Sequence, residues 1–153
     1  AIANNDPAAD YPAAVLGLGA TVITTGREIA GDYFFTYMFE TALQEGEIIT
    51  AVRFPKAAMA SYAKFPNPAS RYAIVGVFAA ETASGVRVAV TGAGPCVFRA
   101  TDMEAALGQA LSSSVELPAP AADGLNSDMH ASAEYRAHLV TVMAKRAIAD
   151  AIA

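Results

Sequence analysis

An uncharged run at residues 72–80 constrains the fold of this chain more than any other feature. A strand with one solvated face alternates apolar and polar residues, and this run does not. It therefore predicts a central strand covered on both faces. A turn with two prolines, Pro66 and Pro68, precedes it. Proline has no N–H for a sheet ladder, so the chain must reverse or cross over between Lys64 and Arg71.

Composition predicts a folded chain that keeps some apolar surface for a partner. Hydrophobic residues make up 54% and charged residues 16% of the 153 residues, which excludes disorder over most of the length. The excess of apolar over charged residues is larger than a free-standing domain of this size usually shows, so some of the apolar surface is expected to meet a partner. The net charge is −5 and no stretch gathers Lys and Arg, which argues against a nucleic-acid partner.

The single cysteine, Cys96, excludes an intramolecular disulfide and a metal site with several thiolates. It favours a reducing, cytoplasmic location. The longest uncharged runs fall far short of the ~20 residues of a membrane helix, so no transmembrane segment is expected. The chain starts without methionine and in the middle of a motif, and we therefore expect a piece of a longer polypeptide.

The pattern of residues 1–55 predicts the end of a mixed α/β domain. Asp6 is expected to cap a helix over residues 8–16, with Pro7 at its first position. The aromatic residues within 32–39 predict a short buried helix or an aromatic plug in the core. Strands are expected at residues 20–24, 27–30 and 48–54. Pro55 ends the last strand, and we place the domain boundary there, before a linker that runs to residue 60.

The pattern of residues 56–153 predicts three or four antiparallel strands followed by helices. Alternating valines predict a half-exposed strand over residues 86–91. Helices are expected at 103–111 and from an N-cap at Ser132 onward, and a short one is considered at 119–123. The last helix is expected to bury Tyr135, Leu139, Val142 and Met143. Its cations are expected mostly on the other side: Arg136, Lys145 and Arg146.

Few residues form a recognisable catalytic pattern. His130 and His138 lack the spacing of a zinc site, and Cys96 between apolar neighbours favours an inert buried thiol. Asp10 has two interpretations. On pattern alone, a first-turn acid that complements the helix dipole is favoured over a carboxylate that accepts hydrogen bonds from ligand hydroxyls. Lys64 is either a lysine at a strand end or a cation directed at an anionic cofactor.

Five segments resemble one protein family. They are IANNDPAADYPAAVLGLGATV, GEIITAVRFP, YAKFPNPASRYAIVGV, VAVTGAGPCVFRA and SAEYRAHLVTVMAKRAI. In the same order and at similar spacing, they resemble blocks of the FAD-binding subunits of the molybdenum hydroxylases, which include aerobic carbon monoxide dehydrogenase and xanthine dehydrogenase. The resemblance runs essentially from end to end and is strongest to the carbon monoxide dehydrogenase medium subunit.

The resemblance implies an α+β fold. Residues 1–55 would be the remnant of a vanillyl-alcohol-oxidase-type FAD domain, and residues 56–153 a C-terminal domain of three antiparallel strands plus a helical bundle. The implied partners are a large subunit with the molybdenum cofactor and a small subunit with [2Fe-2S] clusters, in a dimer of heterotrimers. Electrons would pass through these groups to FAD and on to an external acceptor, in the cytoplasm or at the inner face of the membrane.

The resemblance also implies site residues. Five positions match flavin-contacting residues of the family: the polar Asn4, the acid Asp10, the apolar Ile49, the cation Lys64, and either Tyr72 or Ile74 near the isoalloxazine ring. Asp10 corresponds to an acid that hydrogen-bonds the sugar-alcohol or ribose hydroxyls, so the ligand interpretation becomes the favoured one. Lys64 corresponds to a lysine that reaches the cofactor from the second domain.

Two other functions stay open. The chain could be an interaction module that docks partner subunits through its apolar surface without binding a cofactor. It could also be a stand-alone small-molecule-binding domain, which predicts a closed pocket in place of an open sheet edge.

We predict that this chain alone binds FAD weakly or not at all. The family holds the FAD pyrophosphate with two glycine-rich loops upstream of Ile2, and backbone N–H groups of such loops supply most of the anion binding. Titration of FAD with the chain should leave flavin fluorescence unchanged. Quenching at micromolar concentrations would contradict the prediction.

Overall fold

A four-stranded antiparallel sheet forms the centre of the computed structural model, which describes residues 1–153. Its strands lie in the order β6 (Met59–Pro66), β7 (Ala73–Thr82), β8 (Gly85–Thr91) and β9 (Phe98–Arg99). The prediction of a central strand after residue 72 is confirmed, because β7 pairs on both sides and is buried over most of its length. The turn between β6 and β7 lies where the two prolines predicted it.

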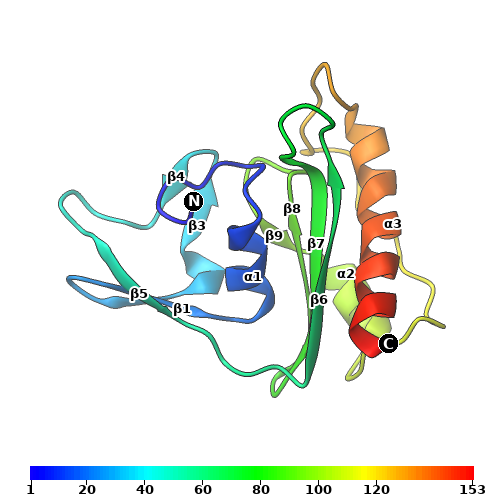
Figure 1. The fold of residues 1–153 in the computed structure, drawn as a ribbon, viewed down its shortest axis with the longest axis horizontal. Coiled ribbons are helices and arrows are strands. Elements are labelled where there is room, and N and C mark those ends of the chain that lie inside the picture. The colour runs from blue at the N-terminus through cyan, green and yellow to red at the C-terminus, as the bar shows by residue number, and fades with distance from the viewer.

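Both faces of this sheet are covered, so the molecule has three layers (Figure 1). The longer helix α3 (Ala133–Ile152) and the short α2 (Thr101–Leu107) cover one face. Helix α1 (Tyr11–Gly17) and the rest of the N-terminal part lie against the other face. These two layers exclude water from β7 on both sides, which explains why its sequence carries no charge before Glu81.

The N-terminal part has its own small core. Its strands form two small sheets, in the order β2-β1-β5 and β3-β4. The elements are β1 (Thr21–Thr24), β2 (Glu28–Ala30), η1 (Gly31–Tyr33), β3 (Phe35–Tyr37), β4 (Glu40–Thr41) and β5 (Ile49–Arg53). Val15, Ala20, Val22, Ile29 and Phe34 are buried together between them. The predicted α+β class is therefore confirmed, with the strands near the expected positions.

The expectation for residues 32–39 is largely wrong. This segment is a 3-10 turn followed by strand β3, and of its aromatic residues only Phe34 is fully buried. Tyr33, Tyr37 and Phe39 are each more than half exposed. Phe35 is half-buried and packs edge-on against Phe34 with ring centroids 5.1 Å apart. Aromatic density predicted a core plug, but the strand alternation sends most of these rings outward.

The expectation that the strand at residues 86–91 is half-exposed is also wrong. Its alternation was identified correctly: Val86, Val88 and Val90 face the main core with α2 and α3. The opposite side, with Arg87 and Thr91, is buried as well. The N-terminal part covers that side, which sequence alternation alone could not indicate.

Helix boundaries differ from the sequence prediction at three places. Helix α1 begins at Tyr11, and Asp6 Oδ1 instead accepts from the backbone N–H of Ala8 at 2.9 Å in a preceding turn. Helix α2 ends at Leu107, and residues 119–123 are not helical. The predicted N-cap of α3 is confirmed, because Ser132 Oγ accepts from the backbone N–H of Tyr135 at 3.2 Å. No helix has the length and apolar character needed to cross a membrane.

Arg87 joins the N-terminal part to the sheet. Its Nε and Nη2 donate to the Leu16 carbonyl at 3.0 and 2.7 Å, and Nη2 also donates to Asp32. Leu16 lies in the last turn of α1, and its carbonyl also accepts from the backbone N–H of Gly19 at 3.1 Å. A buried guanidinium thus satisfies a helix end and an acid from the other layer at once.

We predict that Arg87→Met lowers the free energy of unfolding by about 2 kcal/mol, because the Leu16 carbonyl and Asp32 lose a charged donor. Urea unfolding measures the change. Arg53→Met is the matched control, since Arg53 forms an exposed pair with Glu28 and should change stability by less than about 0.5 kcal/mol. Equal effects of the two substitutions would contradict this account.

Candidate functional site

The Asp10 carboxylate joins the two parts of the chain. Asp10 occupies the N-cap position of α1, yet its side chain accepts no backbone hydrogen bond there. Its partners lie on β6: Tyr62 Oη donates to Oδ1 at 2.5 Å, and Lys64 Nζ donates to Oδ2 at 3.0 Å. The Asp10 and Lys64 side chains keep 40% and 27% of their surface exposed, so both remain open to a ligand.

Strand β6 presents both donors because Tyr62 and Lys64 are two residues apart and therefore share one face. Gly76 lies opposite Lys64 in the neighbouring strand β7. A Cβ at Gly76 would overlap the Tyr62 hydroxyl, so this glycine makes room for the ring. Burial, together with the hydrogen bond to Asp10, raises the pKa of Tyr62 well above its ordinary value. The hydroxyl therefore stays protonated and donates.

The loop between β6 and β7 is held at three points. Lys64 Nζ donates a second hydrogen bond to the Arg71 carbonyl at 3.0 Å, and Arg71 has a positive φ of 65°. Asn67 Oδ1 accepts from the backbone N–H groups of Ala69 and Ser70 at 2.9 and 3.3 Å. Asn67 Nδ2 lies 3.3 Å from Nδ1 of His130, which belongs to the loop before α3. The lysine that contacts Asp10 thus also fixes the loop that leads to Tyr72.

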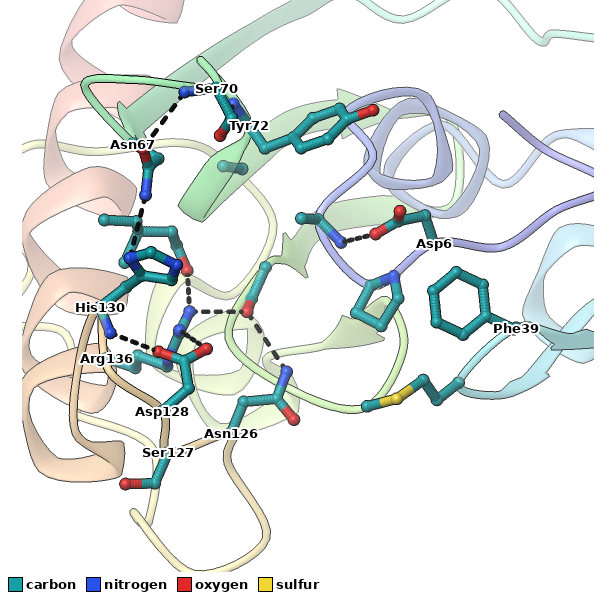
Figure 2. Close-up of a pocket in the computed structure, with 16 residues that line it drawn as sticks. Asp6, Phe39, Asn67, Ser70, Tyr72, Asn126, Ser127, Asp128, His130 and Arg136 are labelled. Carbon is teal, nitrogen blue, oxygen red and sulfur yellow. Dashed lines mark hydrogen bonds and ion pairs between the residues drawn. The ribbon is translucent and has the colours of Figure 1, made fainter.

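A cavity of about 430 Å³ opens beside this loop (Figure 2). The N-terminal part contributes residues 6–8 and the tip of the β3–β4 hairpin, and the C-terminal part contributes the rest of the lining. Two of the predicted site residues line it, Tyr72 and Ile74. Tyr72 is 57% exposed, whereas Ile74 is buried. The two alternatives for one position therefore lie at the same cavity.

Arg136 forms the floor of this cavity and was missed by sequence reasoning. It was expected mostly on the outer side of α3, which is wrong, since it is buried. Its Nη1 donates to the carbonyl groups of Ile74 at 2.7 Å and Gly92 at 3.0 Å, and its Nη2 donates to Asp128 Oδ2 at 2.8 Å (Figure 2). The available signal was helical spacing, because Arg136 lies three residues before the buried Leu139 and shares its face.

Backbone contacts fix the segment that leads to Asp10. Thr91 Oγ1 donates to the carbonyl groups of Ala9 at 2.7 Å and Pro7 at 3.1 Å. The backbone N–H of Gly92 donates to the Pro7 carbonyl at 2.8 Å. Gly92 has a φ of 83°, and a Cβ there would lie 2.7 Å from the Ile74 carbonyl oxygen. Only glycine permits the chain to pass this closely.

Two predicted site residues lie apart from these groups. Asn4 is exposed, and Ile49 is half-buried against the small N-terminal core. The neighbouring Asn5, which sequence reasoning passed over, is fully buried and donates to the carbonyl groups of Tyr37 and Glu40 at 2.7 Å each. The structure thus unites Asp10 with Lys64, and separately brings Tyr72 and Ile74 to one cavity.

The remaining candidates give no catalytic group. No three His, Cys, Asp or Glu side chains lie close enough together to hold a metal ion. Cys96 is half-buried, and this burial raises the pKa of its thiol. Fold and site together define a two-part α+β unit in which an acid and a lysine meet where the parts join.

The chain belongs to a known family on both of its parts. Residues 1–57 match the FAD-binding domain in molybdopterin dehydrogenase, and residues 60–151 match the carbon monoxide dehydrogenase flavoprotein C-terminal domain. This confirms the family resemblance of the sequence and identifies FAD as the cofactor of that family domain. The chain corresponds to part of a medium, FAD-binding subunit.

Individual relatives agree with this assignment. The chain is 31% identical to the nicotine 6-hydroxylase medium subunit of Paenarthrobacter nicotinovorans and 29% identical to the carbon monoxide dehydrogenase medium chain of Afipia carboxidovorans, over 98% and 95% of its own length. It spans 58% and 57% of those proteins. It also superposes on carbon monoxide dehydrogenase from Oligotropha carboxidovorans with a TM-score of 0.80 and 26% identity, covering 97% of this chain and 58% of that one.

The residues present fit one part of FAD. A carboxylate accepts hydrogen bonds from hydroxyl groups, and Asp10 keeps lone pairs and open surface for them. The cavity with Tyr72 offers room for an aromatic ring. The fit does not extend to a pyrophosphate, because the fully charged groups at the cavity are Asp6, Asp128 and the already paired Arg136. The residues present therefore suit the hydroxyl-bearing and ring portions of FAD.

We predict that Arg136→Met lowers the free energy of unfolding by about 3 kcal/mol, because Asp128 and two buried carbonyl groups lose a charged donor. Arg146→Met is the control on the same helix, since Arg146 is exposed and forms no ion pair. Thermal and urea unfolding of the two variants provide the comparison. A tolerated Arg136→Met would show that the cavity floor holds without the guanidinium.

Proposed function

We propose that this chain is the flavin-contacting and C-terminal portion of the medium subunit of a molybdenum hydroxylase, and that it helps to pass electrons through FAD to an external acceptor. The observation that carries the proposal is the contact between Asp10 and Lys64 at 3.0 Å. It joins two residues 54 positions apart, one from each part of the chain, and leaves both accessible.

Each proposed contact has a distinct physical role. Asp10 accepts hydrogen bonds from sugar-alcohol or ribose hydroxyls, and Lys64 places a positive charge beside them. Tyr72 or Ile74 faces the ring system, while Asn4 and Ile49 add a polar and an apolar contact. FAD itself supplies the redox chemistry, and the protein supplies placement and electrostatics. We keep the boundary near residue 55 as the division between the two domains.

The proposal includes the rest of the complex. The names of the relatives describe medium chains or subunits, which supports assembly with other chains. We propose a large subunit with the molybdenum cofactor and a small subunit with [2Fe-2S] clusters, in a dimer of heterotrimers. The proposed location is the cytoplasm, with the inner face of the membrane as the alternative.

A second candidate function is an interaction module that docks partner subunits without a cofactor. Exposed apolar side chains on and beside the β3–β4 hairpin favour it: Tyr33, Tyr37, Met38 and Phe39. The two functions differ in one observable. A complete subunit that carries bound flavin absorbs at about 450 nm, a property of the flavin chromophore, whereas a cofactor-free docking module does not.

We predict that Asp10→Asn and Lys64→Met each weaken FAD binding by the complete subunit about tenfold or more. Hydrogen bonds to charged groups contribute roughly 1.5–3 kcal/mol, and about 1.4 kcal/mol corresponds to tenfold. Flavin fluorescence and the bound flavin content measure the loss. Asp150→Asn, an exposed carboxylate on α3, is the matched control and should bind FAD normally. Undiminished affinity in both site variants would refute the proposed flavin contact.

A further inference from the structure

Tyr62 is not among the site residues that the family resemblance implies and has no part in the proposed function so far, yet it makes the shortest contact to Asp10. Its hydroxyl donates to Oδ1 at 2.5 Å, while Lys64 holds Oδ2 at 3.0 Å. Each carboxylate oxygen therefore has one lone pair used by β6 and another left for a ligand. A carboxylate bound at both oxygens cannot rotate about its terminal torsion.

We infer that Tyr62 is a positioning residue for the flavin, which fixes the Asp10 carboxylate so that its free lone pairs meet the cofactor hydroxyls. The inference rests on the proposed function, because it assigns Tyr62 to the same contact. Tyr62 acts through Asp10 and need not touch the cofactor. The short, charge-assisted geometry is the kind that contributes most to orientation.

The sheet is built to keep the Tyr62 hydroxyl at this place. Gly76 lies in the central strand β7, and an added Cβ would overlap both the Oη and the ring of Tyr62. Glycine weakens a strand interior, so its presence in a buried central strand requires a reason, and the tyrosine ring supplies one. Lys64 lies across from Gly76, so the glycine, the tyrosine and the lysine form one unit on two paired strands.

This arrangement can be disturbed in two independent ways. Tyr62→Phe removes the hydroxyl and keeps the ring, whereas Gly76→Ala keeps the hydroxyl but displaces the ring that carries it. In both variants Asp10 loses its Oδ1 partner while Lys64 remains. We expect each to weaken FAD binding by the complete subunit about tenfold, as measured by fluorescence titration.

The matched control is Tyr11→Phe. Tyr11 adjoins Asp10 in sequence, is 69% exposed and makes no side-chain hydrogen bond, so this variant should bind FAD like the parent. Thermal unfolding of the cofactor-free proteins accompanies each titration. It separates a loss of affinity from a loss of fold, and Gly76→Ala and Tyr62→Phe provide two chances to obtain a folded variant.

A double-mutant cycle distinguishes positioning from general support. If Tyr62 acts only through Asp10, then Tyr62→Phe combined with Asp10→Asn should bind FAD no more weakly than Asp10→Asn alone. Additive losses would overturn the inference, because they mean that Tyr62 supports binding by another route.

The affinity for FAD analogues distinguishes positioning from a purely structural role, because a structural role would weaken the binding of every analogue alike. Two FAD analogues serve as probes, one without the ribityl hydroxyls and one without the adenosine ribose hydroxyls. For the analogue that lacks the hydroxyls bound by Asp10, the parent and Tyr62→Phe should bind equally. A tenfold difference that persists with both analogues would contradict positioning.

The experiment separates failure of the inference from failure of the proposed function. If Asp10→Asn weakens FAD binding but Tyr62→Phe and Gly76→Ala do not, the flavin contact stands and the inference about Tyr62 is wrong. If Asp10→Asn leaves FAD binding unchanged, the proposed contact itself is wrong and the inference falls with it.

Discussion

The central sheet has to be shielded from water on both faces, and the other parts of the structure follow from that requirement. Strands β7 and β8 bury nearly every residue, so neither face can be left to solvent. Helices α2 and α3 provide one cover and the N-terminal part provides the other (Figure 1). The two family domains are therefore halves of one packed unit at this interface, although their sequences match separate families.

Polar contacts across this interface are made largely to backbone carbonyl groups. Arg87 donates to the Leu16 carbonyl, Thr91 donates to those of Pro7 and Ala9, and the backbone N–H of Gly92 donates to that of Pro7. A carbonyl group is present whatever side chain its residue carries. Such contacts therefore tolerate substitution in the accepting segment, which fits a TM-score of 0.80 to a protein only 26% identical.

The sequence could predict the elements whose pattern depends on local physics. The uncharged residues 72–80 indicated a central strand, and Ser132 indicated the start of α3. It could not predict which polar residues are buried, because Arg87 and Arg136 are covered by segments far away in the chain. The residue pattern singled out Asp10 and Lys64 with two interpretations each, the resemblance favoured a ligand role, and their direct contact required the fold. Sequence reasoning missed Tyr62 because its partner Asp10 lies 52 positions away. It missed Arg136 because two of the groups that this residue binds are backbone carbonyls.

Thr91 and Gly92 bind the backbone of residues 7–9, so the segment that leads to Asp10 is held in place by the second domain. Exchange of domains between related medium subunits at residues 57–60 would respect the family boundaries, yet it would pair residues 7–9 with a foreign β8 strand. Recombination is better tolerated when both segments of such a contact come from the same parent protein. The segments that would have to be exchanged together to keep the proposed flavin contact are therefore discontinuous in sequence: the turn before α1, strand β6 and the end of β8.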